Sequence, residues 1–438
     1  MDILVMVGQL LLGLSILVGV HEAGHMISAK WFGMRVEKFS IGFPPKIFGK
    51  QIGETEYMIG AVPLGGFVKI TGMVDESLDT DALSGPPQPY EFRAKPAWQR
   101  LIVMLGGIIV NVLTGIIIFS LLLYAYGETY VPAREAERFG VIPNELGQKI
   151  GFRTGDKIVK INGRPFERFN DVYAPDVVLG SASYYTVERN GQLVDIPVPV
   201  TIMNELSDQD KALFVAPRMP FKVKRVVPGN NASKAGIQAN DRIVRIGDTP
   251  IQFFDELQAA LLKYAGKTAP IQVQRGSQVL PLQVAVSESG KVGLEQEPLL
   301  KLETRDYSLV ESFPEGTKQA FGIITTQAKA FGKILKRQAS ASESLGGPIE
   351  IAQQYGSTWD WPWFWRMTGM LSMVLAFMNL LPIPALDGGH VMFLTYEMLS
   401  GRKPSDKFLE NAQKVGMVLI LSLMVFILVI NPIMKAMR

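Results

Sequence analysis

Four stretches of the chain are apolar for long enough to predict helices that cross a membrane. A helix needs about 20 predominantly apolar residues to span a bilayer. The first stretch contains only Gln9 and Ser15 as clearly polar residues, and its helical pattern continues to about Lys30. The third stretch breaks at Pro382 and Pro384, because proline does not continue a helix. The stretches cover residues 3–20, 101–126, 367–381 and 415–430, and they predict a polytopic α-helical membrane protein with four transmembrane helices.

The composition and the N-terminus favour the same class. Charged residues make up only 19% of the 438 residues, whereas soluble domains average about 25%. The chain begins Met1-Asp2, without the positive start and small-residue cleavage site of a secretory signal peptide, so a retained membrane helix is favoured over that alternative. A net charge of +3 and the absence of a long basic block give no indication of nucleic acid binding, so no nucleic acid partner is expected.

Basic residues near the predicted spans indicate which loops are cytoplasmic, because cytoplasmic loops carry an excess of Lys and Arg. They follow the first span, precede the second, and lie between the third and the fourth. The tail residues Lys435 and Arg438 argue weakly for the other orientation. Residues 127 to about 360 are therefore expected on the extracytoplasmic side. The basic residues used are Lys30, Arg35, Lys38, Arg93, Lys95, Arg100, Arg402, Lys403, Lys407 and Lys414.

The extracytoplasmic segment contains an internal repeat. "KIGFRTGDKIVKING" (149–163) aligns with "KAGIQANDRIVRIGD" (234–248) at an offset of 85 residues. Each copy runs from a Gly to an Asp and then into a short strand that ends at a turn, which predicts two copies of one small β-rich domain. The pattern resembles tandem PDZ domains, with expected boundaries at 127–220 and 221–308.

Residues 40–72 include "EYMIGAVPLGGFVKI" (56–70), in which β-favouring residues surround a Pro-Leu-Gly-Gly break. Two interpretations remain open from the residues alone. One is an ordinary cytoplasmic loop, and the other is a β-hairpin that dips towards the membrane.

The segment "VHEAGH" (20–25) places His21, Glu22 and His25 inside the first predicted helix. Residues four apart share a helix face, so both imidazoles project from the same side. In the H-E-x-x-H arrangement two imidazoles hold zinc, and the Glu activates a bound water. A catalytic zinc site has three protein ligands and one open position, so the motif lacks one ligand.

The third ligand has to come from elsewhere in a chain that has no cysteine. The segment "NLLPIPALDGGH" (379–390) supplies Asp387 after a Pro-x-Pro break. Irregular backbone at membrane depth is tolerated where it lines a polar cavity, so Asp387 is expected to face a polar pocket. Two alternatives stay open. Asp387 caps a following cytoplasmic helix, or His390 serves as a ligand or supports one.

These motifs together resemble the bacterial site-2 proteases of the RseP type, and the resemblance covers essentially the whole chain. It rests on HEAGH in a first transmembrane helix, on Asn-x-x-Pro-x-Pro-x-Leu-Asp-Gly-Gly in a later one, and on a PDZ pair between spans. The resemblance implies that His21, His25 and Asp387 bind one Zn²⁺ per chain and that Glu22 is the general base.

The resemblance also implies how substrate is held. Asn379 matches a family Asn that hydrogen-bonds substrate backbone near the metal. Gly65 and Gly66 fall in a membrane-associated β-loop that holds substrate as an added strand. Asn111 matches the Asn of a family Gly-Pro-x-x-Asn motif in the second span, although the segment here reads Gly106-Gly107-Ile108-Ile109-Val110-Asn111 and lacks the expected proline in register.

The function implied is cleavage of transmembrane segments of single-pass proteins in a bacterial inner membrane, with the PDZ pair on the periplasmic side. Implied substrates are an anti-sigma factor that another protease has already trimmed, and remnant signal peptides. The PDZ pair would exclude substrates with bulky extracytoplasmic domains. The expected segments are 1–30 (first helix), 31–97 (cytoplasmic, membrane-associated β-loop region), 98–126 (second helix), 127–220 and 221–308 (PDZ-like), 309–362 (linker and helices), 363–390 (third helix), 391–414 (cytoplasmic loop) and 415–432 (fourth helix).

A rival hypothesis is a non-catalytic PDZ scaffold in the membrane whose metal is structural. The intact Glu22 disfavours it, because a structural metal site needs no base. A transporter built on the broken third span is also disfavoured, because the sequence lacks the paired discontinuous helices of inverted repeats.

Overall fold

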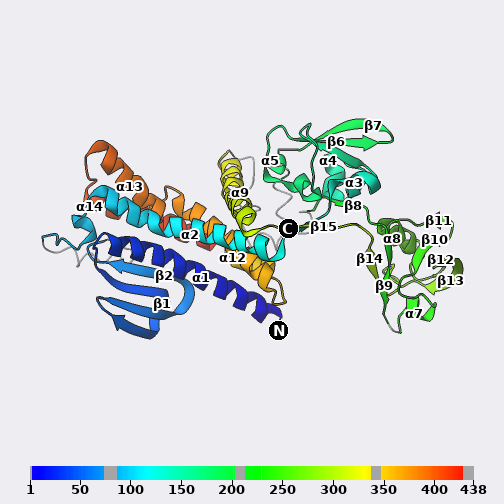
Figure 1. The fold of residues 1–438 in the computed structure, drawn as a ribbon, viewed down its shortest axis with the longest axis horizontal. Coiled ribbons are helices and arrows are strands. Elements are labelled where there is room, and N and C mark those ends of the chain that lie inside the picture. The colour runs from blue at the N-terminus through cyan, green and yellow to red at the C-terminus, as the bar shows by residue number, and fades with distance from the viewer. Residues whose placement is uncertain are drawn as a thin grey trace. The chain divides into compact units, whose positions relative to one another are not determined.

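The computed structural model describes residues 2–73, 86–200, 202, 213–227, 229–336 and 347–427. The chain forms two compact units, one made of Met1–Glu128 and Asp306–Arg438 and the other of Thr129–Arg305. Figure 1 shows the first unit as long helices beside one β-hairpin and the second as small sheets with short helices. This division agrees with β-rich domains inserted into a helical membrane protein.

The first unit is built around the helices α1 and α2. Three helices of the described residues are long and apolar enough to cross a membrane, and they cover Ile3–Trp31, Ala97–Tyr126 and Lys407–Val425. They correspond to the first, second and fourth predicted spans. The helices of this unit are α1 (Asp2–Trp31), η2 (Phe92–Ala94), α2 (Ala97–Tyr126), α9 (Leu309–Leu335), α11 (Pro348–Tyr355), α12 (Trp361–Leu380), α13 (Asp387–Ser400) and α14 (Asp406–Val425).

The region predicted as third span and cytoplasmic loop differs from its prediction. Helix α12 ends at Leu380, and the prolines that follow separate it from α13, which begins at Asp387. The predicted loop 391–414 is largely helical, because α13 continues to Ser400 and buries Leu394 in a cluster with Val103 of α2. Helix α14 then begins at Asp406, nine residues before the predicted fourth span, whose last residues lie outside the described part of the chain.

Glycines let α1 and α2 pack unusually closely. A Cβ built on Gly24 would lie 2.4 Å from the carbonyl oxygen of Gly106, and a Cβ on Gly106 would lie 2.6 Å from that of Gly24. Small residues permit such backbone approach in membrane helices. The contact brings the second half of α1, which carries the HExxH motif, directly against α2.

Residues 36–70 form the hairpin of strands β1 (Val36–Ile52) and β2 (Thr55–Ile70), blue in Figure 1 and beside α1. Both strands are long and bend along their length, so that the start of β1 pairs with both the first and the last part of β2. Phe39, for example, lies opposite both Tyr57 and Val68. The last part of β2, residues 66–70, pairs on one side with the start of β1 and forms an edge of this sheet. The structure therefore confirms a β-hairpin in this segment, and its approach to the membrane stays a prediction.

The second unit contains two hydrophobic cores, one formed by residues between Ala136 and Val215 and the other by residues between Phe221 and Leu294. The first core is covered by the sheets β5-β6-β7 and β4-β8, and the second by β11-β10-β12-β13 and β14-β9. The elements are β3 (Glu128–Tyr130), α3 (Ala133–Phe139), β4 (Val141–Pro143), α4 (Glu145–Ile150), β5 (Lys157–Ile161), η3 (Phe169–Tyr173), α5 (Pro175–Val178), β6 (Tyr184–Arg189), β7 (Gln192–Pro197), β8 (Val215–Pro217), β9 (Phe221–Val226), α7 (Asn231–Lys234), β10 (Arg242–Ile246), β11 (Thr249–Pro250), α8 (Phe254–Leu262), β12 (Thr268–Arg275), β13 (Gln278–Ala285), β14 (Leu294–Pro298) and β15 (Glu303–Arg305).

The sequence repeat corresponds to a repeated polar clasp. In the first copy Arg189 donates from Nε and Nη2 to the two carboxylate oxygens of Asp156, at 2.7 and 2.6 Å. In the second copy Arg275 does the same to Asp241, at 2.8 and 2.7 Å. Each arginine also donates to the carbonyl oxygen of the repeated glycine, at 2.8 Å in both copies. The repeated Asp is thus a buried anchor between the turn that precedes its strand and the next strand of the sheet.

Candidate metal centre and catalytic cavity

Three side chains from distant parts of the first unit converge on one point. The Nε2 atoms of His21 and His25 lie 3.2 Å apart, and Oδ2 of Asp387 lies 3.1 Å from the first and 3.4 Å from the second. All three residues are largely buried. Among the described residues, these are the His, Asp and Glu side chains whose ligand atoms lie close enough together to hold one metal ion. The structure thus brings together the motif of α1 and the first residue of α13.

The spacing of these atoms fits a zinc ion. Zinc-ligand bonds of about 2.0–2.1 Å in a tetrahedron place neighbouring ligand atoms about 3.3–3.4 Å apart. The three observed separations of 3.1–3.4 Å therefore form one face of such a tetrahedron. A fourth corner is left for water or substrate, as in catalytic zinc sites.

The hydrogen bonds around the site orient both imidazoles for metal binding. Nδ1 of His25 lies 2.8 Å from the carbonyl oxygen of Val103 and therefore carries the proton, which leaves the lone pair on Nε2. Oδ2 of Asp387 is buried and accepts no well-directed hydrogen bond from the described residues. Two electron-rich atoms thus face each other at 3.4 Å, an arrangement that a cation between them stabilises.

His21 is oriented by a side chain of α2. Its Nδ1 lies 3.1 Å from Nδ2 of Asn111, while Oδ1 of Asn111 is buried without a partner among the described residues. A rotation of the amide by half a turn exchanges these two atoms, and such amide orientations are assigned from the hydrogen-bond network. With Oδ1 towards the ring, Nδ1 of His21 donates to Asn111, and Nε2 keeps its lone pair for the metal. Asn111 is fully buried and faces protein.

The backbone approaches this centre closely at glycines. A Cβ on Gly107 would lie 2.4 Å from Nε2 of His25 and 2.5 Å from Cε1 of His21. A Cβ on Gly388 would lie 2.1 Å from the carbonyl oxygen of Leu381. Gly107 therefore lets α2 cover the imidazoles, and Gly388 lets the proline loop fold over the start of α13. Side chains at these two positions would displace the ligands.

The metal ligands open onto a cavity of about 510 Å³ that also holds Glu22. The backbone of Val68 in β2 faces the Glu22 carboxylate. Gly66 lies nearby, where a Cβ would be 3.3 Å from Cγ of Glu22 and 2.7 Å from Val18. The edge of β2 therefore forms one wall of the cavity, with the Glu of the motif against it.

The structure places the remaining predicted site residues as follows. Asn379, at the end of α12, lines the cavity, and its Nδ2 lies 3.3 Å from Nε2 of His21. Gly66 lines the cavity too, while Gly65 lies against the ring of Phe43, which itself lines the cavity. His390 lines the cavity without belonging to the cluster of three ligand atoms.

Several residues of the site carry no recognisable motif in the sequence. The carbonyl group of Val103 and the backbone of Val68 act through peptide groups, so their side chains give no signal. Gly107 could have been found only as a glycine in a long apolar helix, next to Gly106 and four residues before Asn111.

Two histidines and an aspartate with an open fourth position, beside a glutamate in a cavity, define the class of zinc metallopeptidases. The chain belongs to peptidase family M50, whose sequence profile matches residues 9–423. It is a zinc metalloprotease of the site-2 protease family and, with its long apolar helices, a multi-pass membrane protein.

Full-length relatives support this assignment. The Regulator of sigma E protease of Haemophilus influenzae is 28% identical over 452 residues, which cover 98% of each chain. The Regulator of sigma-E protease RseP of Escherichia coli K12 is 26% identical over 443 residues, 94% of this chain and 95% of the relative. The likeness thus extends across both units of the chain.

Proposed function

We propose that the protein cuts transmembrane segments of single-pass membrane proteins within the bilayer. The observation that carries the proposal is the position of Glu22. It lies in an apolar helix of 29 residues, next to the His pair and inside a cavity bounded by a strand edge. An ionisable group at this depth is a functional feature by default, because burying it in a membrane is unfavourable.

The residues divide the chemical work as follows. A zinc ion held by His21, His25 and Asp387 would lower the pKa of a bound water and polarise the scissile carbonyl group. Glu22 accepts the proton of the attacking water and passes it to the leaving nitrogen. The backbone of Val68 faces the Glu22 carboxylate across the cavity, so the base lies between the metal ligands and the strand edge.

A transmembrane helix has to unwind before its peptide bonds can be attacked, because its backbone groups are bonded within the helix. Residues 66–70 of β2 offer a strand edge along the cavity. An unwound substrate segment added to this edge would recover backbone hydrogen bonds. Asn379 would donate to a substrate carbonyl group close to the metal, and Gly66 would keep the approach free of side chains.

We further infer four spans and an inner-membrane location. The remaining span, the third along the chain, would be α12, whose first turns carry tryptophans of the kind found at membrane interfaces. Trp359, Trp361 and Trp363 are each more than 40% exposed. The positive-inside pattern then places the hairpin in the cytoplasm, and the two β-rich PDZ-like domains on the periplasmic side. The pair would act as a filter that excludes substrates with bulky extracytoplasmic domains.

The names of the relatives point to a substrate class. Both relatives are named as regulators of sigma E, so an anti-sigma factor that has lost its extracytoplasmic domain is the substrate we propose. Remnant signal peptides have the same single-pass character. The rival, a PDZ scaffold with a structural metal, leaves the placement of Glu22 in an open cavity unexplained.

A cleavage assay in membranes tests the proposal. Wild-type protein should cut a trimmed single-pass substrate, and Glu22→Gln should reduce the rate by at least about 100-fold while zinc content stays at one per chain. Undiminished cleavage by Glu22→Gln would contradict the mechanism. A protein that neither cuts nor needs Glu22 to bind partners would support the scaffold.

The same assay tests the filter. A version lacking residues 127–308 should cut an untrimmed substrate that the full chain spares. Unchanged discrimination between trimmed and untrimmed substrate would exclude a gating role for the inserted domains.

A further inference from the structure

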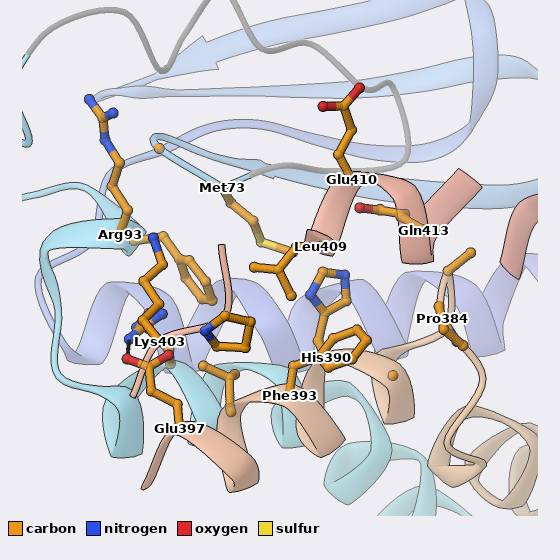
Figure 2. A pocket seen from close by; sticks show the side chains of 17 residues that line it. Met73, Arg93, Pro384, His390, Phe393, Glu397, Lys403, Leu409, Glu410 and Gln413 are labelled. Carbon is orange, nitrogen blue, oxygen red and sulfur yellow. Dashed lines mark hydrogen bonds and ion pairs between the residues drawn. The ribbon is translucent and has the colours of Figure 1, made fainter. Parts of the chain in front are cut away.

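A second cavity adjoins the catalytic cavity of the first unit. It has a volume of about 220 Å³ and lies between the end of β2 and the helices α13 and α14 (Figure 2). We call it the side chamber and define it by Met73, Phe92, His390, Phe393 and Leu409. Met73 and His390 also line the catalytic cavity, as do Ala385 and Gln413. The two spaces therefore meet at a shared boundary beside the metal centre.

The side chamber is predominantly apolar. Figure 2 shows Met73, Leu409, His390 and Phe393 around its centre. The charged groups at its rim are already engaged. Arg100 donates to Glu397 at 2.5 Å, and Glu410 accepts from Lys414 at 2.6 Å. A charged ligand would compete with these pairs, whereas an apolar group would bury surface without breaking them.

The direction of β2 leads into the side chamber. Val68 lies opposite Glu22, the strand ends at Ile70, and a turn follows in which the Met73 N–H donates to the carbonyl oxygen of Ile70 at 3.2 Å. Successive strand residues advance about 3.3 Å and alternate in direction. A segment added along residues 66–70 would therefore reach the side chamber within about three to five residues of the bond that faces Glu22.

We propose that the side chamber is a specificity subsite that receives one bulky apolar side chain of the substrate. The proposal rests on the proposed function, since it requires a substrate strand along β2. The volume suits this occupant, because an apolar cavity of about 150 Å³ already holds a benzene ring. Phe393 and Leu409, which face the chamber from α13 and α14, would set the size of the side chain that fits.

Cross-linking maps the occupant without cleavage. The chain has no cysteine, so Leu409→Cys in a Glu22→Gln background provides a single reactive position. Substrates with one cysteine each, scanned across about six positions on either side of the cut, should cross-link strongly at one position within about five residues of it. Val418→Cys, on the exposed face of the same helix, serves as the matched control and should show no such preference.

Cleavage preference tests the size of the subsite. At the mapped position, wild-type protein should favour Phe or Leu over Ala. Leu409→Trp, which fills the chamber, should lower the ratio of Phe-substrate to Ala-substrate cleavage by at least about tenfold. Phe393→Ala, which enlarges the chamber, should raise the ratio of Trp-substrate to Ala-substrate cleavage. Val418→Trp should leave both ratios unchanged. Ratios compare two substrates on one variant, so a general loss of folded protein does not imitate the effect.

Two results would overturn the proposal. One is uniform cross-linking of Leu409→Cys to every substrate position or to none, and the other is unchanged size preference in both variants. Tightly bound lipid that is lost from Leu409→Trp, together with absent cross-linking, would assign the chamber to an acyl chain instead. Cross-linking is measured on the Glu22→Gln protein, so failure of the proposed hydrolysis and failure of this subsite give different results.

Discussion

The two units of the chain each bury aspartates in polar clusters, and the clusters are completed in opposite ways. Asp241, in the inserted unit, accepts from Arg275 on both oxygens and from the Gln238 N–H on Oδ2 at 2.8 Å. Asp387, in the helical unit, has the buried Oδ2 facing two imidazole nitrogens without a well-directed hydrogen bond. The first carboxylate is satisfied by protein, whereas the second is complete only with a cation.

This difference separates a structural role from a catalytic one. A buried charge that is paired and hydrogen-bonded holds elements together, and removal of its partner is strongly destabilising. A buried carboxylate can instead lack a partner within the protein. Binding of an external cation then stabilises it and contributes to the stability of the fold. The clasps should therefore control the stability of their own domains, and the metal cluster should control the response of the chain to zinc.

The largest expected effect is on the more buried of the two clasps. Arg189→Ala should lower the local free energy of unfolding of the first inserted domain by about 3–5 kcal/mol, because it leaves the carboxylate of Asp156 buried and unpaired. Hydrogen exchange of the β5 and β6 amides in the full-length protein measures this value. A decrease of less than about 1 kcal/mol in this free energy of unfolding would show that the clasp contributes little to the stability of the domain. Zinc content should not change.

The second clasp sharpens this prediction. The Arg275 side chain is 33% exposed, against 18% for Arg189, so water screens its pair more and Arg275→Ala should cost less. Burial raises the pKa of Asp241, but the hydrogen bonds from Arg275 and from the Gln238 N–H outweigh it and hold the pKa below its usual range. The stabilisation is therefore present above the unfolded pKa and disappears as the pH falls through the folded one. Arg275→Ala should weaken that acid sensitivity.

The metal cluster, in contrast to the clasps, should determine how much stability the protein gains from zinc. Free zinc at about 100–1,000 times its dissociation constant stabilises a folded protein by about 2.7–4.1 kcal/mol. The wild type should gain this stability in detergent when zinc is added after chelation, and Asp387→Ala should gain almost none. Arg189→Ala should keep the full zinc-dependent gain on a lower baseline. A zinc response that survives in Asp387→Ala would remove this residue from the ligand set.

The sequence predicted the parts of each cluster that follow a local rule. His21 and His25 follow from helix periodicity, and the repeated aspartates follow from the repeat itself. The partners of these aspartates did not, because Arg189 and Arg275 lie in later strands outside the aligned frame. Their pairing depends on sheet register, which the repeat does not encode.

The fold around the metal was predictable to a similar extent. Pro382 and Pro384 predicted a break before Asp387, but not the long α13 helix that follows it. That helix forms because Leu394 buries itself against α2, a contact between residues almost 300 positions apart. The side chamber was beyond sequence reasoning for the same reason, since its walls come from the end of β2, from η2, and from α13 and α14.

Asn111 gives the smallest of these effects and the finest test of the comparison, because it belongs to the metal cluster without binding the metal. If its amide oxygen accepts from Nδ1 of His21, Asn111→Ala should weaken zinc binding by about 10–100-fold, which corresponds to about 1.4–2.7 kcal/mol. Asn111→Asp keeps an oxygen at that place and should restore most of the affinity. The rate of zinc loss to a chelator measures both variants without any substrate.

Ser372→Ala is the control for packing around Asn111. Ser372 donates to the backbone oxygen of Asn111 at 2.8 Å and is fully buried, but the atom it contacts is not the one that faces the imidazole. The rate at which Ser372→Ala loses zinc to a chelator should stay within about twofold of wild type. If Asn111→Asp releases zinc as fast as Asn111→Ala, the amide only fills space. In that case Asn111 does not set the orientation of the His21 ring, and the satisfied and open clusters differ less in construction than their hydrogen bonds indicate.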